Sequence, residues 1–241
     1  MTHVAKRTTV GFEPSYNKNG FSPNPVPYEL TPNTAFSKGD MVVLTGGKVA
    51  KAAAGSVAGL LGVMAHSVAQ AANPADKITY GLVYDNPDMV YKVSIADARN
   101  YTATGGNANK LTVTAADGGL TTADVFNGGM LYVYEGKNKG AIRTITDYAA
   151  AANVATFTVT APFDVQCDTT TKFVICGGGS EANDAINVGT SGILLKDSQR
   201  VDGDADILDS AALVGPLVCV AMDLENLTMD VMIRRSKHLL G

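Results

Sequence analysis

Short runs of alternating apolar and polar residues, each closed by turn-forming residues, constrain this chain more than any other feature. Successive side chains of a β-strand point to opposite faces, so an alternation of period two predicts a strand with one buried face. Between residues 100 and 179 these runs are rich in threonine. We predict strands at residues 111–114, 130–134, 141–146, 155–160 and 172–176. This region is therefore expected to form an antiparallel β-module.

The regions on either side of the module have the same character with less threonine. Residues 38–52 predict a hairpin, because two β-rich runs flank the turn dipeptide Gly46-Gly47. Further strands are expected at residues 59–68, 77–84, 89–95, 192–195, 217–223 and 227–235. The run Gly177-Gly-Gly-Ser is typical of a flexible hinge at the end of the module.

These patterns predict an all-β fold of three parts. Residues 40–99 and 180–241 are expected to be the two halves of a small β-barrel or β-tulip-like domain, and residues 100–179 the antiparallel module inserted between them. The ends of a domain often lie close together, which favours this arrangement. Residues 1–39 precede the barrel as an extended amino-terminal arm.

The arm is defined by its composition. It holds five of the nine prolines, and proline excludes a long helix or a central strand because it lacks the backbone donor. Its spaced aromatic residues favour an arm that docks on a partner over a loose tail, which remains the alternative. The candidate contact residues are Phe12, Tyr16, Phe21 and Tyr28. On this reading, deletion of residues 1–32 leaves a folded protein.

The overall composition excludes several classes of protein. A net charge of −4 argues against nucleic-acid binding, which needs a surplus of lysine and arginine. Charged residues make up 17% of the chain, against about 25% in average proteins, as suits a surface covered by partners. Glycine and polar residues interrupt the uncharged stretch at 52–75, so we expect no membrane span, and residues 1–20 show no signal peptide.

The residues that carry chemistry form no recognisable motif. We expect no catalytic, cofactor-binding or metal-binding residues, no small-molecule substrate and therefore no enzyme. Three cysteines far apart in sequence suit the cytosol, and Cys176 and Cys219 in apolar runs are expected to be buried and inert. The alternating carboxylates Asp202, Asp204 and Asp206 fail the calcium-loop pattern at later positions, so a solvated loop is favoured over an ion site.

Two segments resemble proteins of tailed bacteriophages. Residues 128–148, 155–163 and 168–175 resemble a β-module of phage structural proteins that typically reads Gly-x-Gly-x-Arg-x-Ile, an alternating strand, a Pro-aromatic pair and an Asp-Thr-x-Ser/Thr-x-Phe strand. Lys139 departs from this pattern. The residues that fit it are Gly140, Arg143, Ile145, Pro162, Phe163 and Phe173.

The second resemblance lies near the start of the chain. Residues 38–43 and 62–65 look like the "Gly-Asp-x-Val" strand and "Gly-Val-Ala" strand that open the barrel of capsid decoration (cement) proteins. This resemblance implies a structural virion protein, assembled in the host cytoplasm. It would bind the major capsid protein on the outer capsid surface as a homotrimer and bridge capsomers.

Several alternatives stay open at this point. The same β-modules suit a head fibre base or a tail protein, and the inserted module suits a glycan-binding surface. Arg143 stabilises a surface loop in one interpretation and pairs with a partner's carboxylate in another, with Asp147 as a plausible local partner. The basic residues Arg234, Arg235, Lys237 and His238 are expected to be an ordinary solvated strand end.

Overall fold

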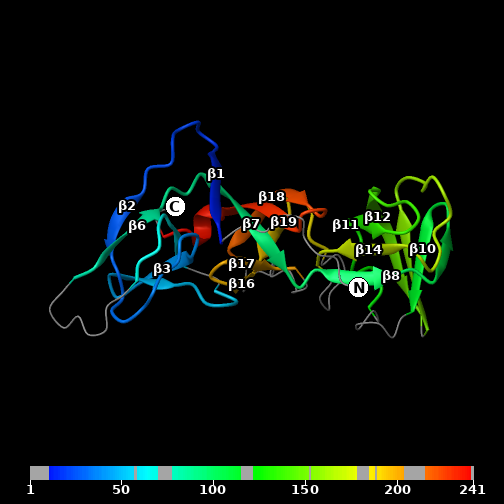
Figure 1. Ribbon diagram of the computed structural model, residues 1–241, viewed down its shortest axis with the longest axis horizontal. Coiled ribbons are helices and arrows are strands. Elements are labelled where there is room, and N and C mark those ends of the chain that lie inside the picture. Colours follow the sequence, from blue (N-terminus) through cyan, green and yellow to red (C-terminus); the bar gives the residue numbers. More distant parts are fainter. Residues whose placement is uncertain are drawn as a thin grey trace.

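The computed structural model describes residues 11–56, 59–69, 78–114, 122–151, 153–177, 185–187, 189–203 and 215–239. These residues form nineteen β-strands and one short 3-10 helix, η1 (Arg235–Lys237), and none of them is in an α-helix. The predicted all-β class is therefore confirmed. The molecule is elongated, with a small barrel-like sheet at each end and a third sheet between them (Figure 1).

The first end sheet has five strands in the order β2-β6-β5-β3-β4. Its strands are β2 (Val26–Glu29), β3 (Met41–Thr45), β4 (Lys48–Lys51), β5 (Leu60–Met64) and β6 (Tyr80–Tyr84). A bridge between Leu30 and Val49 brings the ends of β2 and β4 together, and Thr31 N donates to Val49 O at 2.8 Å. The sheet thus curls into a nearly closed barrel.

The predicted hairpin at residues 38–52 is present in this first barrel. Strands β3 and β4 pair from Val42 with Lys51 to Thr45 with Lys48, which leaves a two-residue loop. Gly46 and Gly47 both have positive φ, 58° and 78°, as the favoured two-residue hairpin turn requires. The sequence Gly-Gly therefore sets the register of this hairpin.

The second end sheet has seven strands in the order β8-β14-β11-β12-β13-β10-β9. Its strands are β8 (Arg99–Thr102), β9 (Gly105–Asn107), β10 (Lys110–Thr114), β11 (Met130–Glu135), β12 (Ile142–Ala150), β13 (Val154–Val159) and β14 (Lys172–Ile175). β8 and β9 follow each other along the chain, and they pair with β14 and β10 respectively. Because one stretch of chain thus contacts both ends of the sheet, this barrel is also nearly closed.

Aromatic rings fill the interior of the second barrel. Phe157 lies at its centre, with ring centroids 4.8 Å from Tyr148, 5.4 Å from Phe173, 5.5 Å from Phe126 and 5.9 Å from Tyr101. All five side chains are buried. The period-two alternation places the four rings that lie on strands inside and the threonines of those strands outside, as the sequence predicted, whereas Phe126 enters the interior from a turn.

The sheet between the two barrels is built from segments on both sides of the second barrel in sequence. Its strands are β1 (Glu13–Asn17), β7 (Met89–Ala96), β15 (Ser191–Ile193), β16 (Leu195–Asp197), β17 (Arg200–Asp202), β18 (Leu217–Asp223) and β19 (Thr228–Ile233). β7 lies at its centre, antiparallel to β19 and β1 and parallel to β17. The chain thus leaves the central sheet through β7, forms the second barrel and returns to pair with the same strand.

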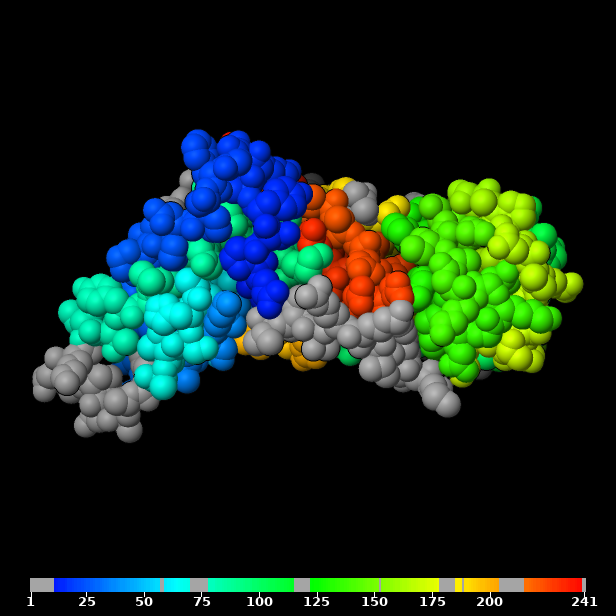
Figure 2. Space-filling view, turned by 45° about the horizontal axis from the view of Figure 1, so that its top comes forward, coloured from blue at the N-terminus to red at the C-terminus, as the bar shows by residue number. Residues whose placement is uncertain are grey.

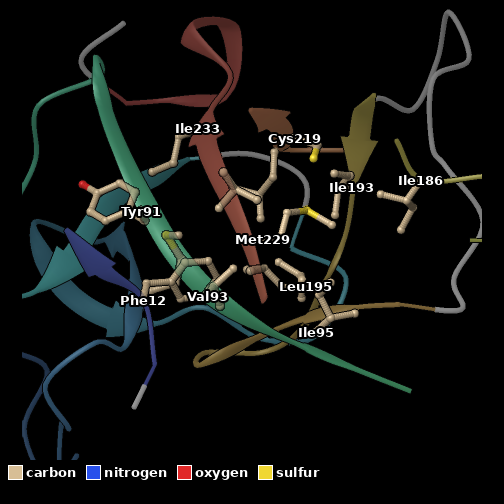
Figure 3. Packing of buried hydrophobic residues seen from close by; sticks show 14 of the residues in the cluster. Phe12, Tyr91, Val93, Ile95, Ile186, Ile193, Leu195, Cys219, Met229 and Ile233 are labelled. Atoms are coloured by element: carbon tan, nitrogen blue, oxygen red, sulfur yellow. The ribbon is translucent and has the colours of Figure 1, made fainter. Parts of the chain in front are cut away.

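The central sheet packs on the outer faces of both barrels. Its core includes Phe12, Tyr91, Val93, Ile193 and Met229 (Figure 3). The same core takes outer-face residues from β3 and β5 of the first barrel and from β11 and β14 of the second: Met41, Leu60, Val63, Tyr132 and Val174. The two barrels are therefore held to the central sheet by continuous apolar packing.

The amino-terminal segment is extended, but it pairs with the chain's own sheets. β1 pairs with β7, and β2 pairs with β6. Its prolines are placed where a sheet tolerates them: β1 shifts register just after Pro14, and the segment's two strands are short. Removing residues 1–32 would take away both strands and the buried side chains of Phe12 and Leu30, so the structure leads us to expect that the truncated chain is strongly destabilised.

Candidate interaction surfaces

The five residues predicted from the sequence to contact a partner lie in different environments. Phe12 is 0% exposed, whereas Tyr16 is 45% and Phe21 70% exposed. Because Phe12 packs in the central core, its ring is not available to a partner, and that assignment must be corrected. The spacing of aromatics alone did not distinguish a ring that anchors the segment from one that projects outward.

Phe21 projects from a loop whose base is fixed by Asp88. The backbone carbonyl of Asp88 accepts a hydrogen bond from Lys18 N at 3.1 Å. Its carboxylate accepts from Asn19 Nδ2 at 2.7 Å and from Arg235 Nη2 at 2.7 Å. The hydrogen bond from Arg235 lowers the pKa of Asp88, so the carboxylate keeps its charge at neutral pH. The hydrogen bonds from Lys18 and Asn19 to Asp88 therefore anchor the base of the loop, while the ring of Phe21 stays exposed.

Tyr28 stabilises the first barrel, and its side chain is largely engaged within the chain. Its ring is part-buried against the core of that barrel, and its hydroxyl donates to Asp85 Oδ2 at 2.6 Å. Burial and this hydrogen bond raise the pKa of Tyr28 to about 12. The hydroxyl is therefore neutral and already engaged within the chain.

Arg143 stabilises a loop of its own barrel. Its Nη2 donates to Pro162 O at 2.9 Å, and its Nε lies 3.2 Å from Ala161 O. The guanidinium also stands over the ring of Phe163, 5.3 Å from its centroid. Of the two interpretations of Arg143, the geometry supports the loop-stabilising one. The suggested local partner Asp147 does not take part in these contacts.

An apolar row on β6 and the residues just before it was not recognised from the sequence. Ile78, Tyr80 and Leu82 occupy alternate positions and are 63%, 59% and 38% exposed, so they face outward together. Pro27 of β2 lies directly opposite Leu82 and is also exposed. The neighbouring residues Gly81 and Val83 are small or apolar too, so the alternation did not show which face would be buried.

The second barrel also leaves large apolar side chains outside. Ile142 is 48% and Val165 52% exposed. Asn138 holds the backbone beside Val165, because its Nδ2 donates to Val165 O at 2.7 Å and its Oδ1 accepts from Val165 N at 3.1 Å. Exposed apolar residues therefore occur on both barrels, which lie at opposite ends of the molecule (Figure 2).

The three cysteines are free thiols, and all are buried. Burial raises the pKa of Cys176 to about 12 and that of Cys219 to about 12, and it also raises the pKa of Cys167. The reactive thiolate is therefore strongly disfavoured at neutral pH. The expected burial of Cys176 and Cys219 is confirmed.

The acidic and basic clusters show ordinary contacts where they are described. Asp202 lies 3.5 Å from Lys196 Nζ, and Asp204 and Asp206 lie outside the described residues. Within the described part of the chain, no three histidine, cysteine or acidic side chains come together as metal ligands. Arg235 of the carboxy-terminal cluster is exposed and pairs with Asp88 at 2.7 Å. His238 of the same cluster is 5% exposed, so the expectation that it is solvated is wrong, because it packs beside Leu60 and Leu61 of the first barrel.

Comparisons with known proteins found no matching family model, curated protein or solved structure. Among the residues that the structure describes, no helix is long and apolar enough to cross a membrane. The function of the chain is therefore inferred from its exposed side chains and its architecture.

Proposed function

We propose that this chain is a structural virion protein that binds the outer surface of a capsid, contacts the major capsid protein and holds neighbouring capsomers together. The resemblance of residues 38–43 and 62–65 to decoration proteins suggests this class. One structural observation carries the proposal: an elongated molecule exposes large apolar side chains on both of its end barrels. A bridge between two capsomers needs an adhesive surface at each end.

At the first end, the adhesive residues are Phe21 and the row Ile78, Tyr80 and Leu82. Full burial of such a side chain contributes about 1.5 to 3 kcal/mol. Aromatic rings at the centre of an interface commonly dominate its binding energy. Phe21 suits this role because its loop is already held by Asp88, so binding orders little additional chain.

The rigidity of the molecule supports the bridging role. The central core includes Met41 and Leu60 of the first barrel and Tyr132 and Val174 of the second. A load between the ends is therefore carried by packed side chains rather than by a linker. A protein that binds only the assembled shell stabilises it by mass action, and several weak contacts on a symmetric lattice add through avidity.

The test measures how many copies stay on purified heads after washing, and how well the heads resist heat. The double variant Tyr80→Asp with Leu82→Asp should lose most of its occupancy, because it places two charges in the apolar row. Thr169→Asp adds charge at an exposed turn outside both apolar groups and should bind as the unchanged protein does. Full occupancy by the double variant, or heads equally heat-resistant without the protein, would refute the proposal.

The same particles test the expected trimer and the nearest alternative class. Native mass measurement of the free protein reports whether three copies associate. A decoration protein occupies many equivalent positions on a head, whereas a fibre base or a tail protein occupies few. Counting copies per particle therefore separates these assignments.

A further inference from the structure

We propose that the outer face of β10, β12 and β13 binds the same face of a second copy of this chain across a twofold axis. This face belongs to the second barrel and uses only the part of β12 from Asp147 onward, so it does not include Ile142 or Val165, the exposed apolar residues of that barrel named above. The inference concerns contacts between copies and does not depend on the proposed capsid role.

Pairing register defines the face. Thr112 lies opposite Thr156, and Thr156 lies opposite Ala149 on the next strand. These three side chains point outward, because their neighbours Leu111, Tyr148 and Phe157 are buried inside the barrel. At one end of the same strands, Thr114 lies opposite Val154, which is 43% exposed. The face is therefore made mainly of small side chains that let another sheet approach closely.

The strand order places β10 and β13 of this face away from the rest of the molecule, and β12 pairs with the docking strand β11 only at its first residues, 142–144. The barrel docks on the central sheet through β11 and β14, whose outer residues Tyr132 and Val174 join the central core. Around the nearly closed barrel, β10 lies opposite β11 and β13 lies opposite β14. The face thus looks outward from the end of the elongated molecule, where β10 is seen in Figure 1.

Two opposite charges flank the face in a symmetric way. Thr158 of β13 lies between Lys110 of β10 and Asp147 of β12, and it is directly opposite both. Lys110 and Asp147 are exposed, and within the described part of the chain neither forms an ion pair. Two strand spacings separate them, or about 9 to 10 Å. One positive and one negative charge therefore stand at equal distances on either side of β13.

A second copy places an opposite charge next to both Lys110 and Asp147. A twofold axis running close to the direction of β13 places Thr156 and Thr158 over the same residues of the partner. It also exchanges the two flanks, so that each Lys110 faces the Asp147 of the other copy. Such a contact is isologous, since the same patch serves both copies. Facing sheets pack about 10 Å apart, a gap that a lysine and an aspartate side chain span together.

Charge reversal tests this geometry. Lys110→Glu places two acidic groups together at each flank, and Asp147→Lys places two lysines together. Each single variant should therefore self-associate at least about tenfold more weakly than the unchanged protein. An equimolar mixture of the two should form mixed pairs, since every flank then joins opposite charges. The double variant should pair with itself again.

Sedimentation equilibrium at several concentrations, on full-length chains whose folding is checked by circular dichroism, measures these associations. Lys139→Glu makes the same charge change on an exposed loop of the same barrel and should associate like the unchanged protein. Thr156→Arg sets like charges against each other on the axis and should weaken pairing independently of the flanks. If trimers form through another surface, pairing doubles the trimer mass.

Several results would overturn the inference. An unchanged protein that never pairs, single variants that associate normally, or a mixture that fails to associate would each exclude the twofold contact. So would an equal loss in Lys139→Glu, because the effect would then follow net charge rather than position.

Discussion

The carboxylate of Asp40 accepts a hydrogen bond from the Ser198 hydroxyl at 2.9 Å, across 158 positions of the chain. The same carboxylate accepts from Ser37 N at 2.7 Å and pairs with Lys51 Nζ at 2.9 Å. Beside it, Met41 N donates to Ser198 O at 2.6 Å. Asp40 therefore ties the first barrel to the β16–β17 turn of the central sheet.

Replacing Asp40 with alanine should destabilise the protein by about 2 to 4 kcal/mol, because the Asp40 side chain is 1% exposed and its three donors would lose their acceptor. Urea unfolding monitored by circular dichroism measures the change. Asp164→Ala removes an exposed carboxylate and should fall within about 0.5 kcal/mol of the unchanged protein. Equal stabilities of the two variants would show that Asp40 does not hold the junction.

Replacement of Phe12 by alanine should mainly lower stability, whereas replacement of Phe21 by alanine should mainly weaken capsid attachment. Phe12→Ala should cost about 3 to 5 kcal/mol, because it empties a fully buried position in the central core. Phe21→Ala should change stability by less than about 0.5 kcal/mol, since its ring is mostly exposed, while weakening attachment to capsids. Thermal unfolding and head binding, measured on both variants, separate the two roles. A stable Phe12→Ala protein would contradict the placement of residues 11–17.

Gly136 should not tolerate a side chain. A Cβ at this position would lie 1.9 Å from the carbonyl oxygen of Thr170, and φ is +80°. Gly136→Ala should therefore cost more than about 3 kcal/mol through strain and a backbone clash. Gly140 is the matched control, because its φ is +90° but nothing lies within 4 Å of an added Cβ. Gly140→Ala should cost only about 1 kcal/mol, and a similar cost for both variants would argue against the close approach of Thr170.

Asp168 should titrate below the usual range of an aspartate. Hydrogen bonds from Lys137 and Thr170 lower its pKa to about 2, against about 3.9 in an unfolded chain. Because the folded pKa is the lower one, the contribution of this group to stability is complete above pH about 4 and is lost as the pH falls toward 2. Carboxyl NMR titration measures the midpoint. Lys137→Met should raise that midpoint and Lys139→Met should not, whereas an ordinary midpoint in the unchanged protein would contradict the contact.

The three cysteine thiols should not react with a labelling reagent in the folded protein. With pKa values of about 12 for Cys176 and Cys219, and with all three cysteines buried, a thiol-specific reagent at pH 8 should label none of them within the time needed to label free cysteine. In concentrated urea all three should react. Rapid labelling of the native chain would show that these side chains are more accessible than the fold allows.

Local chemistry was enough to predict most of the strands. The alternation around Phe157 and Tyr148 identified strands and the faces that turn inward, and Gly46-Gly47 identified a hairpin and its turn. These features depend on residues within a few positions of one another, because the period of a strand and the φ angles of a turn are local properties.

Contacts between distant segments decided the remaining features. Phe12 and Phe21 have similar sequence surroundings, yet one is buried because the central sheet covers it and the other is exposed. Likewise, Tyr132 looks outward from its own barrel and is buried only because the central sheet packs against it. Which face of a strand meets solvent depends on what lies across from it in space, and the period of the sequence carries no information about that neighbour.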